Sequence, residues 1–210
     1  GAMDDGENSS VYPALAAVPR HLFGLCVAEN DGALYAVGDA GHPFAIMSVS
    51  KPFVFALVCQ ALGAEEVRER LGVNATGFPF NSVIAIELND GHPMNPMVNA
   101  GALATTAMMP GRTPAEQWEQ IRAGLSAFAG RQLELDGEVY ACEAATNHRN
   151  QAIARLLQSY GRIESDPLQV VDVYTRQCSL RVTARDLAVM GATLADGGVT
   201  PIYTFAEGDP

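Results

Sequence analysis

A serine and a lysine stand three residues apart in the stretch SVSKPF, residues 48–53. If a helix begins at or just before Ser48, the side chains of Ser48 and Lys51 lie one turn apart on the same face. Ser48 would then lie near the positive end of the helix dipole, within reach of the lysine amine. This arrangement suits a serine nucleophile beside its base. The alternative is a capping serine and a lysine that extends its amine to the surface.

Lys51 is the only lysine among 13 basic residues, and all the others are arginines. An arginine does not give up its proton in a protein, whereas a lysine amine can be neutral in an apolar site. Lowering a lysine pKa from ~10.4 to about 7 requires roughly 4 to 5 kcal/mol of destabilisation of the charged form, which burial can supply. The apolar stretches FAIM and PFVFAL flank the pair. Because Pro52 disfavours the helical conformation at Lys51, the first helical turn is expected to be irregular.

A β-hairpin precedes this pair. The stretch FGLCVAENDGALYAVGD contains two apolar runs, residues 22–28 and 33–38, joined by a turn that includes Asp31 and Gly32. Two such runs with a glycine-containing turn between them predict antiparallel strands. Two strands alone are marginally stable in water, so part of the sheet is missing or supplied from elsewhere, and further strands are expected.

Helical patterns dominate from Ser48 onward. FVFALVCQAL is apolar nearly all round, as in a buried helix, and AEEVRERLG is typical of a short surface helix that ends at Gly72. NHRNQAIARLLQSYG predicts an amphipathic helix that ends at Gly161. Three further helix starts are marked by capping residues: Thr113 with Pro114 and Glu116, Asp166 with Pro167, and Thr183 with Asp186. The predicted fold class is α+β, a hairpin followed by a mainly helical domain.

The composition favours small-molecule chemistry in a soluble globular protein. Of 210 residues, 48% are hydrophobic and 18% are charged, which is enough for a real core. The apolar runs are shorter than the roughly 20 residues needed to cross a bilayer. The net charge of -11 repels phosphates and anionic lipids, so neither nucleic acid nor a membrane is an expected partner.

The cysteines and histidines give no sign of a disulfide framework or a metal site. Cys26, Cys59, Cys142 and Cys178 are far apart among apolar neighbours, so they are expected to be buried free thiols in a reducing cytoplasm. The four histidines form no metal-ligand spacing, and no metal is expected.

Six stretches of the chain resemble the serine-dependent glutaminase family in sequence, order and spacing. They are SVSKPF, TGFPFNSVIAIEL, PMNPMVNAGALATT, CEAATNHRNQAIA, DVYTRQCSL and LADGGV. The resemblance, which runs from Val11 to Ile202, implies a fold like that of β-lactamases and DD-peptidases, with a mainly helical domain and part of an antiparallel sheet. It also implies hydrolysis of free L-glutamine to L-glutamate and ammonia, without a cofactor.

The resemblance assigns Ser48 as the nucleophile and Lys51 as its partner in proton transfer, either directly or through a tyrosine. It assigns substrate contacts to Tyr12, Ser48, Asn99, Glu143, Asn150 and Tyr174. These residue types suit free glutamine, because a carboxylate can receive its ammonium group and amides can bind its carboxylate and carboxamide. Each residue also has a structural alternative: Asn99 as a helix cap, Glu143 and Asn150 as solvent-facing side chains, and Tyr174 as part of the core.

The chain departs from the family pattern at two places. Met47 stands where many members have a glutamine, and after GGVTPI the family continues through another pocket tyrosine and a K-S-G strand, whereas this chain ends in YTFAEGDP. We therefore expect a tail at residues 1–9, a sheet portion at 10–47, a helical domain at 48–200 and the start of a further sheet segment at 201–210. The chain alone is expected to be a poor catalyst, and the complete protein a homo-oligomer, either a dimer or a tetramer.

Two other functions stay open from the sequence. A penicillin-interactive serine hydrolase would share the fold, but the chain lacks the S-D-N and K-T-G motifs. A ligand-binding or partner-binding fragment without turnover would also fit a chain that lacks the closing segment.

Overall fold

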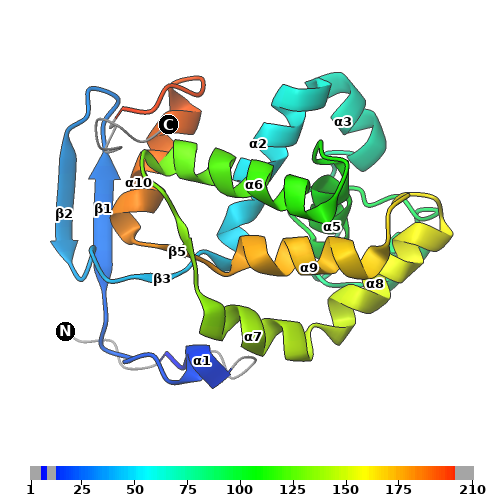
Figure 1. Cartoon of the computed structure of the whole chain (residues 1–210), viewed down its shortest axis with the longest axis horizontal. Coiled ribbons are helices and arrows are strands. Elements are labelled where there is room, and N and C mark those ends of the chain that lie inside the picture. The colour runs from blue at the N-terminus through cyan, green and yellow to red at the C-terminus, as the bar shows by residue number, and fades with distance from the viewer. Residues whose placement is uncertain (1–5, 9–12, 202–210) are drawn as a thin grey trace. The chain divides into compact units, whose positions relative to one another are not determined.

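The computed structural model describes residues 6–8 and 13–201. Its elements in chain order are α1 (Pro13–Ala16), β1 (Gly24–Ala28), β2 (Leu34–Gly38), β3 (Phe44–Ala45), the 3-10 turn η1 (Met47–Val49), α2 (Ser50–Leu62), α3 (Ala64–Leu71), α4 (Ile84–Glu87), α5 (Asn99–Met108), α6 (Pro114–Ala129), β4 (Glu134–Leu135), α7 (Gly137–Thr146), α8 (His148–Ser159), α9 (Pro167–Cys178), β5 (Leu180–Val182) and α10 (Ala184–Ala195) (Figure 1). The predicted α+β class is confirmed. No helix in the described part of the chain is both long and apolar enough to cross a bilayer.

The chain forms two compact units, each built from segments that are distant in the sequence. The strand unit consists of Gly1–Ile46, Ser126–Thr146 and Ser179–Pro210, and the helical unit consists of Met47–Leu125 and Asn147–Cys178. Most of the expected tail at 1–9 and of the expected sheet segment at 201–210 lies outside the described residues.

The predicted hairpin forms in the strand unit. β1 and β2 pair antiparallel, with Gly24 opposite Gly38. In the turn, the Asp31 carboxylate accepts a hydrogen bond from the Ala33 N–H at 2.9 Å, and Gly32 adopts a left-handed φ of 94° that suits glycine. Helix α10 packs against β1, as Figure 1 shows. The hairpin is thus covered by a helix, whereas the expected support was further strands.

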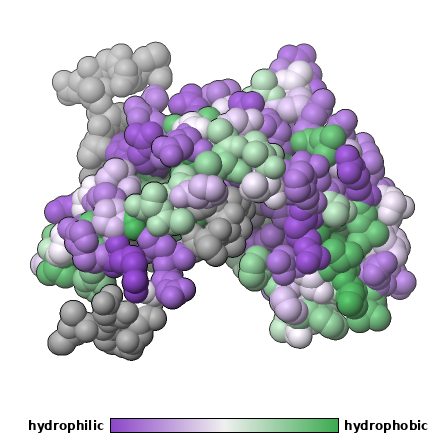
Figure 2. All heavy atoms as spheres, turned by 90° about the horizontal axis from the view of Figure 1, so that it is seen from below, coloured by the Kyte–Doolittle hydropathy of each residue, from purple (hydrophilic) through white to green (hydrophobic). Residues whose placement is uncertain are grey.

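Four apolar side chains of the hairpin stay exposed. Leu25, Val27, Tyr35 and Val37 are 50% to 61% exposed. The register pairs Leu25 with Val37 and Val27 with Tyr35, so all four share one face of the hairpin. Figure 2 shows a mostly hydrophilic surface in which hydrophobic side chains also appear at the edge that carries the hairpin.

A second small sheet in the strand unit was not predicted from the sequence. It has the strand order β3-β5-β4, and all its neighbours are antiparallel. Its strands are only two or three residues long. Strands this short show no alternation of apolar and polar residues, so no local signal marks them.

The predicted capping box at the start of α10 is confirmed and carries an ion pair. The Asp186 N–H donates to the Thr183 hydroxyl at 3.2 Å, and the Thr183 N–H donates to the Asp186 carboxylate at 2.7 Å. Arg131 donates to both Asp186 oxygens, at 2.7 and 2.6 Å. Burial alone would raise the pKa of Asp186, but the hydrogen bonds from Arg131 and Thr183 outweigh it and hold this pKa below its usual value.

We expect Arg131→Ala to lower the free energy of unfolding by about 2 kcal/mol, because the Asp186 side chain, which is only 9% exposed, would lose its ionic partner. Urea unfolding at pH 7 measures the change. The matched control is Arg122→Ala, which removes a pair with Glu119, whose side chain is 58% exposed, and should cost less than about 1 kcal/mol. Equal losses in the two variants would contradict this role for Arg131.

The helical unit has its core between α5, α8 and α9, which pack on one another. The buried cluster there includes Ile86, Leu103, Ile153, Leu157, Val170, Val171, Tyr174 and Cys178. Helix α2, predicted as a buried helix, packs against α3 and α5. The 3-10 turn η1 precedes it, so the chain before Ser50 is irregular, but Lys51, the residue that Pro52 was expected to distort, is helical. Pro52 fits in the first turn of α2, where the N–H groups have no intrahelical acceptor.

Two predictions about local contacts need correction. Glu116 was expected to complete a capping box with Thr113, but its carboxylate accepts from the Arg112 N–H at 2.7 Å instead, while its own N–H donates to the Thr113 hydroxyl. None of the four cysteines forms a disulfide, but only Cys178 is buried. The other three are half-buried.

Candidate functional site

Ser48 lies in the middle of η1, the turn that leads into α2. Its side chain is exposed, while the side chains of Ser50 and Lys51 just after it are buried. Met47, the residue before it, has a left-handed φ of 51°. Ser48 is thus presented at the start of α2, where the helix dipole favours negative charge.

Lys51 lies buried in the helical unit with only 5% of its surface exposed. Its amine donates to Asn99 Oδ1 at 2.8 Å and to the Met97 carbonyl at 3.1 Å. The amine also lies 5.8 Å from the centre of the Phe80 ring. The alternative of a lysine that extends to the surface is therefore wrong.

The burial of Lys51 weakens the preference of its amine for the charged form. Burial lowers the pKa of the Lys51 amine below its usual value, and the nearby Cys178 thiol opposes part of that shift. A neutral amine has two N–H donors and one lone pair. In the neutral form, Asn99 and Met97 would accept both donors and the lone pair would be able to accept a proton, as a general base requires.

Asn99 connects Lys51 to Asn150. Its Oδ1 accepts from Lys51, and its Nδ2 donates to Asn150 Oδ1 at 3.0 Å. Asn99 is the first residue of α5, whose N-cap is Val98, so Asn99 is not the cap itself. Asn150 is half-buried on α8. Three of the residues predicted from the sequence thus form one chain of hydrogen bonds.

A glycine in α5 allows the loop before this helix to come close enough for these contacts. A Cβ at Gly101 would lie 1.8 Å from the Asn95 carbonyl oxygen, so no other residue fits without moving the loop. The Asn95 side chain accepts from the Met97 N–H at 2.7 Å and helps to fix this segment. The Met97 carbonyl is thereby held where Lys51 can donate to it.

The two tyrosines predicted for the site have different outcomes. Tyr174 lies on α9 in the core of the helical unit, 3% exposed. This burial agrees with the alternative that Tyr174 belongs to the core. Tyr12 lies outside the described residues.

Glu143 is a buried carboxylate of the strand unit. It lies on α7 and is 4% exposed, so it does not face solvent. Its Oε1 atom has no hydrogen-bond partner among the described residues. Burial raises the pKa of Glu143 from 4.5 to about 7. A buried acceptor without a donor is suited to bind a cationic group.

The raised pKa of Glu143 predicts a pH-dependent stability. The folded state holds the Glu143 proton more tightly than the unfolded state, so the stabilisation is complete below pH about 4.5 and is lost as the pH rises to about 7. Glu143→Gln cannot ionise, so at pH 8 it should exceed the parent in free energy of unfolding by up to about 3 kcal/mol, with little difference near pH 4. Urea unfolding across this range measures the difference.

Glu138→Gln is the matched control, because Glu138 is exposed on the same helix. It should leave the pH dependence of the parent unchanged. A difference between Glu143→Gln and the parent that stays constant from pH 4 to pH 8 would show that Glu143 does not titrate as stated.

Several contacts of this site were missed from the sequence. The Met97 carbonyl is a backbone group, so no residue type signals it. Ser50 and Gln177 form a buried pair in which Gln177 Nε2 donates to Ser50 Oγ at 3.0 Å. Both residues lie in stretches that carry the family resemblance, SVSKPF and DVYTRQCSL. Their place in these stretches is the one feature of the sequence that could have marked them as part of the site.

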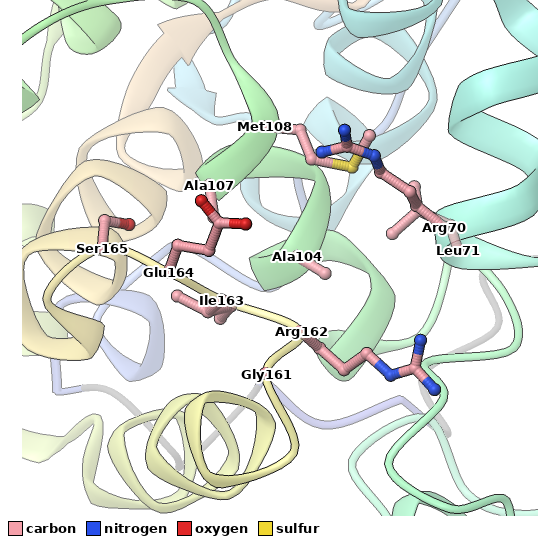
Figure 3. A pocket seen from close by; sticks show the side chains of 10 residues that line it. All are labelled: Arg70, Leu71, Ala104, Ala107, Met108, Gly161, Arg162, Ile163, Glu164 and Ser165. Carbon is pink, nitrogen blue, oxygen red and sulfur yellow. The ribbon is translucent and has the colours of Figure 1, made fainter.

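No metal centre is evident in the part of the chain that the structure describes, where no three His, Cys, Asp or Glu side chains gather. A cavity of about 330 Å³ in the helical unit is lined by Arg70, Met108, Arg162 and Glu164, among others. Figure 3 shows Arg70 beside Met108, with Arg162 pointing away from both. Arg70 is already paired with Glu66 at 2.6 Å. None of the predicted site residues lines this cavity.

Known proteins resemble this chain in sequence. The sequence model of the family described as Glutaminase matches residues 6–206. Glutaminase 2 of Yersinia pestis is 59% identical over 197 residues, which cover 94% of this chain and 58% of that protein. The Glutaminase of Brucella canis is 53% identical over 197 residues, which cover 94% of this chain and 62% of that protein. The chain thus spans about three fifths of the length of these relatives.

Solved structures share the fold. A structure described as a probable glutaminase superposes with a TM-score of 0.93 and 42% sequence identity, over 95% of this chain and 64% of that chain. The crystal structure of Mglu in its L-glutamate binding form superposes with a TM-score of 0.87 and 36% identity, over 95% of this chain and 45% of that chain. The arrangement of helices and small antiparallel sheets is therefore that of glutaminase structures.

Proposed function

Since the chain belongs to the Glutaminase family, we propose that the protein hydrolyses L-glutamine to L-glutamate and ammonia through an acyl-enzyme on Ser48. The observation that carries this proposal is the buried Lys51 amine, held by Asn99 and Met97 one turn beyond an exposed serine. Such a pair supplies a nucleophile and a base, the two groups that acyl transfer requires.

The reaction proceeds in two steps with Lys51 as the proton carrier. The Ser48 oxygen attacks the side-chain carbonyl carbon of glutamine, and its proton passes to the Lys51 amine, directly or through a tyrosine. The carbon–nitrogen bond breaks, ammonia leaves with that proton, and a γ-glutamyl ester remains on Ser48. Water then attacks the ester, gives its proton to Lys51 and releases glutamate, after which Lys51 returns the proton to Ser48. The Ser48 N–H is one donor to the oxyanion.

We assign the head group of glutamine to the remaining predicted residues. Glu143 receives the α-ammonium group, and its buried oxygen without a partner among the described residues supports this role. Asn150 and Asn99 offer amide groups to the carboxylate and carboxamide, and Tyr174 and Tyr12 complete the pocket by resemblance. Binding of L-glutamate by the Mglu relative agrees with a site of this chemistry.

We further propose that the complete protein is a cytoplasmic homo-oligomer, either a dimer or a tetramer. Four cysteines that form no disulfide with one another support a reducing compartment. The exposed apolar face formed by Leu25, Val27, Tyr35 and Val37 supports association through the hairpin. The net charge of -11 argues against nucleic acid and anionic membranes as partners.

Ammonia release from L-glutamine tests the proposed function. The assay compares the chain printed above with a chain that spans the full length of the relatives, and each is paired with its Ser48→Ala variant. We expect equal amounts of ammonia and glutamate from free L-glutamine, and much slower release from glutamine within a peptide, which has no free ammonium for Glu143. If neither chain releases ammonia faster than its Ser48→Ala variant, the proposed function is wrong. Equal rates on free and peptide-linked glutamine would refute only the role of Glu143.

A further inference from the structure

The backbone immediately before Ser48 has an unusual conformation. Met47 has a φ of 51°, in the left-handed region that is sparsely populated by residues other than glycine. Such a conformation persists only where the surrounding structure fixes it, and it directs the residue that follows. The question is therefore which contacts hold Met47 and thereby orient Ser48.

A buried pair of side chains from two helices makes that contact. The Ser50 hydroxyl donates to the Met47 carbonyl at 2.8 Å, and Gln177 Nε2 donates to the Ser50 oxygen at 3.0 Å. Ser50 is 0% and Gln177 1% exposed, so water does not replace either bond. Met47 and Ser50 belong to η1 and α2, whereas Gln177 belongs to α9. All of them lie in the helical unit.

The direction of these bonds is fixed by the groups themselves. A serine hydroxyl has one hydrogen, and Ser50 uses it on the Met47 carbonyl, so its oxygen can only accept from Gln177. Gln177 must therefore present its amide N–H groups to Ser50 and turn its oxygen the other way. There the Thr106 hydroxyl lies 3.3 Å from Gln177 Oε1, and it is also 3.0 Å from the Ala102 carbonyl. A side chain without an N–H or O–H donor at position 177 would leave Ser50 without its partner.

We propose that Gln177 and Ser50 are positioning residues that fix the left-handed backbone at Met47 and so hold the Ser48 hydroxyl and N–H in their reactive orientation. This inference rests on the proposed function only in taking Ser48 as the nucleophile. An apolar residue would fill the space beside α2 equally well. A buried amide is retained there because it supplies the one donor that the Ser50 oxygen can accept.

The first test replaces the amide by an apolar side chain of similar size. Gln177→Met should lower kcat for L-glutamine about 100-fold, since small errors in the placement of a reacting group have effects of this size. KM should stay within about threefold, because the proposed function assigns Gln177 no contact with the substrate. Ser50→Ala should have a similar effect, and the double variant should lose no more than either single variant, because both belong to one unit. Gln169→Met, an exposed position on the same helix, is the matched control with unchanged kcat.

The second test uses a pH profile that a purely structural role would not produce. Gln177→Glu places a buried carboxyl group beside Ser50. The protonated acid has an O–H that can donate to Ser50 as the amide does, whereas the carboxylate has no donor. The ratio of variant to parent kcat should therefore be about 0.01 near pH 8 and should rise several-fold as the pH falls toward 5. Gln169→Glu should show a flat ratio over the same range.

The third measurement does not depend on activity. Hydrogen exchange of the peptide that covers residues 46–53 should become at least tenfold faster in Gln177→Met, while peptides from α5 and α8 keep the rates of the parent. If this peptide is unchanged, the inference is wrong whatever the enzyme does. The same measurement on Ser50→Ala provides an independent check. An unchanged exchange rate of this peptide in both variants would overturn the inference without depending on the folding of either one.

The outcomes separate this inference from the proposed function. If the parent releases no ammonia, the proposed function fails, and the exchange experiment still decides whether Gln177 holds the segment. If the parent is active and Ser48→Ala is not, while Gln177→Met keeps kcat within threefold and Gln177→Glu gives a flat ratio, the proposed function stands and the inference is overturned.

Discussion

Ser48→Ala is expected to lower kcat for glutamine hydrolysis by a factor on the order of 10⁴ or more, because removal of a nucleophile leaves only the binding and oxyanion contributions. KM should change little, since the carboxylate and amide contacts to the head group remain. Ammonia release under saturating glutamine measures the loss. The effect is large because both steps of the reaction need the Ser48 oxygen. Among the described residues next to Lys51 at the start of α2, no other side chain offers an exposed hydroxyl that could replace it.

The stability of the Ser48→Ala variant separates chemistry from folding. Ser48 is exposed, and its loss removes at most a helix-start contact worth about 1 kcal/mol. The matched control is Ser159→Ala at the exposed end of α8, where the hydroxyl donates to the Leu156 carbonyl at 2.7 Å. This control should keep full activity. If Ser48→Ala kept more than a tenth of the parent kcat, the nucleophile would have to be another group.

Lys51→Arg is expected to lower kcat by about 10³-fold or more, although the charge is kept. An arginine cannot serve as a base, and its larger planar group does not fit the two acceptors that hold the Lys51 amine. Lys51→Met, which has a similar length but no nitrogen, should be equally inactive. If both variants are equally inactive, the positive charge alone does not support the reaction, and the removable proton of Lys51 is required. If Lys51→Arg is clearly more active than Lys51→Met, the charge itself contributes.

The pH profile of the parent gives a second test of Lys51. Burial lowers the pKa of this amine, so kcat/KM should be lost as the pH falls through a value below the ordinary lysine pKa of 10.5 and should be retained above it. Arg68→Met, which removes a surface cation on α3, is the control and should keep both the rate and the profile. Near-normal activity of Lys51→Arg would assign the role of base to a tyrosine alone.

Local signals in the sequence predicted much of the fold correctly. The hairpin follows from two apolar runs around Asp31 and Gly32, and the start of α10 follows from Thr183 and Asp186. An irregular helix start was also predicted, but from the restriction that Pro52 places on Lys51, and Lys51 is helical, so the irregular turn at η1 has another cause. The hairpin and the start of α10 depend on residues that are close together in the chain, where propensity and hydrogen bonding act directly.

Features that depend on distant segments could not be predicted in this way. The strands β3, β4 and β5 are too short to show a pattern and form only because three separated segments meet. The sequence likewise gave no sign that residues 126–146 and 179–201 group with the hairpin, since such contacts leave no local periodicity. The burial of thiols was overestimated for the same reason, because apolar neighbours in sequence do not decide how deep a residue lies.

The candidate site shows the same division. Ser48, Lys51, Asn99 and Asn150 were found from motifs, and the structure connects the last three by hydrogen bonds. The Met97 carbonyl and the pair formed by Ser50 and Gln177 were missed, because a backbone acceptor has no residue type and a buried amide resembles any polar residue in sequence. The unpaired, buried state of Glu143 also becomes visible only in three dimensions.

Trapping of the acyl group tests the central claim most directly. Hydroxylamine competes with water for a γ-glutamyl ester on Ser48, so the parent incubated with L-glutamine should form the γ-glutamyl hydroxamate at the expense of glutamate, while ammonia release does not fall. The Ser48→Ala variant should form neither product above the rate without enzyme. Release of ammonia and glutamate at undiminished rates with no hydroxamate, or hydroxamate formed equally fast by Ser48→Ala, would contradict a glutaminase that works through an acyl-enzyme on Ser48.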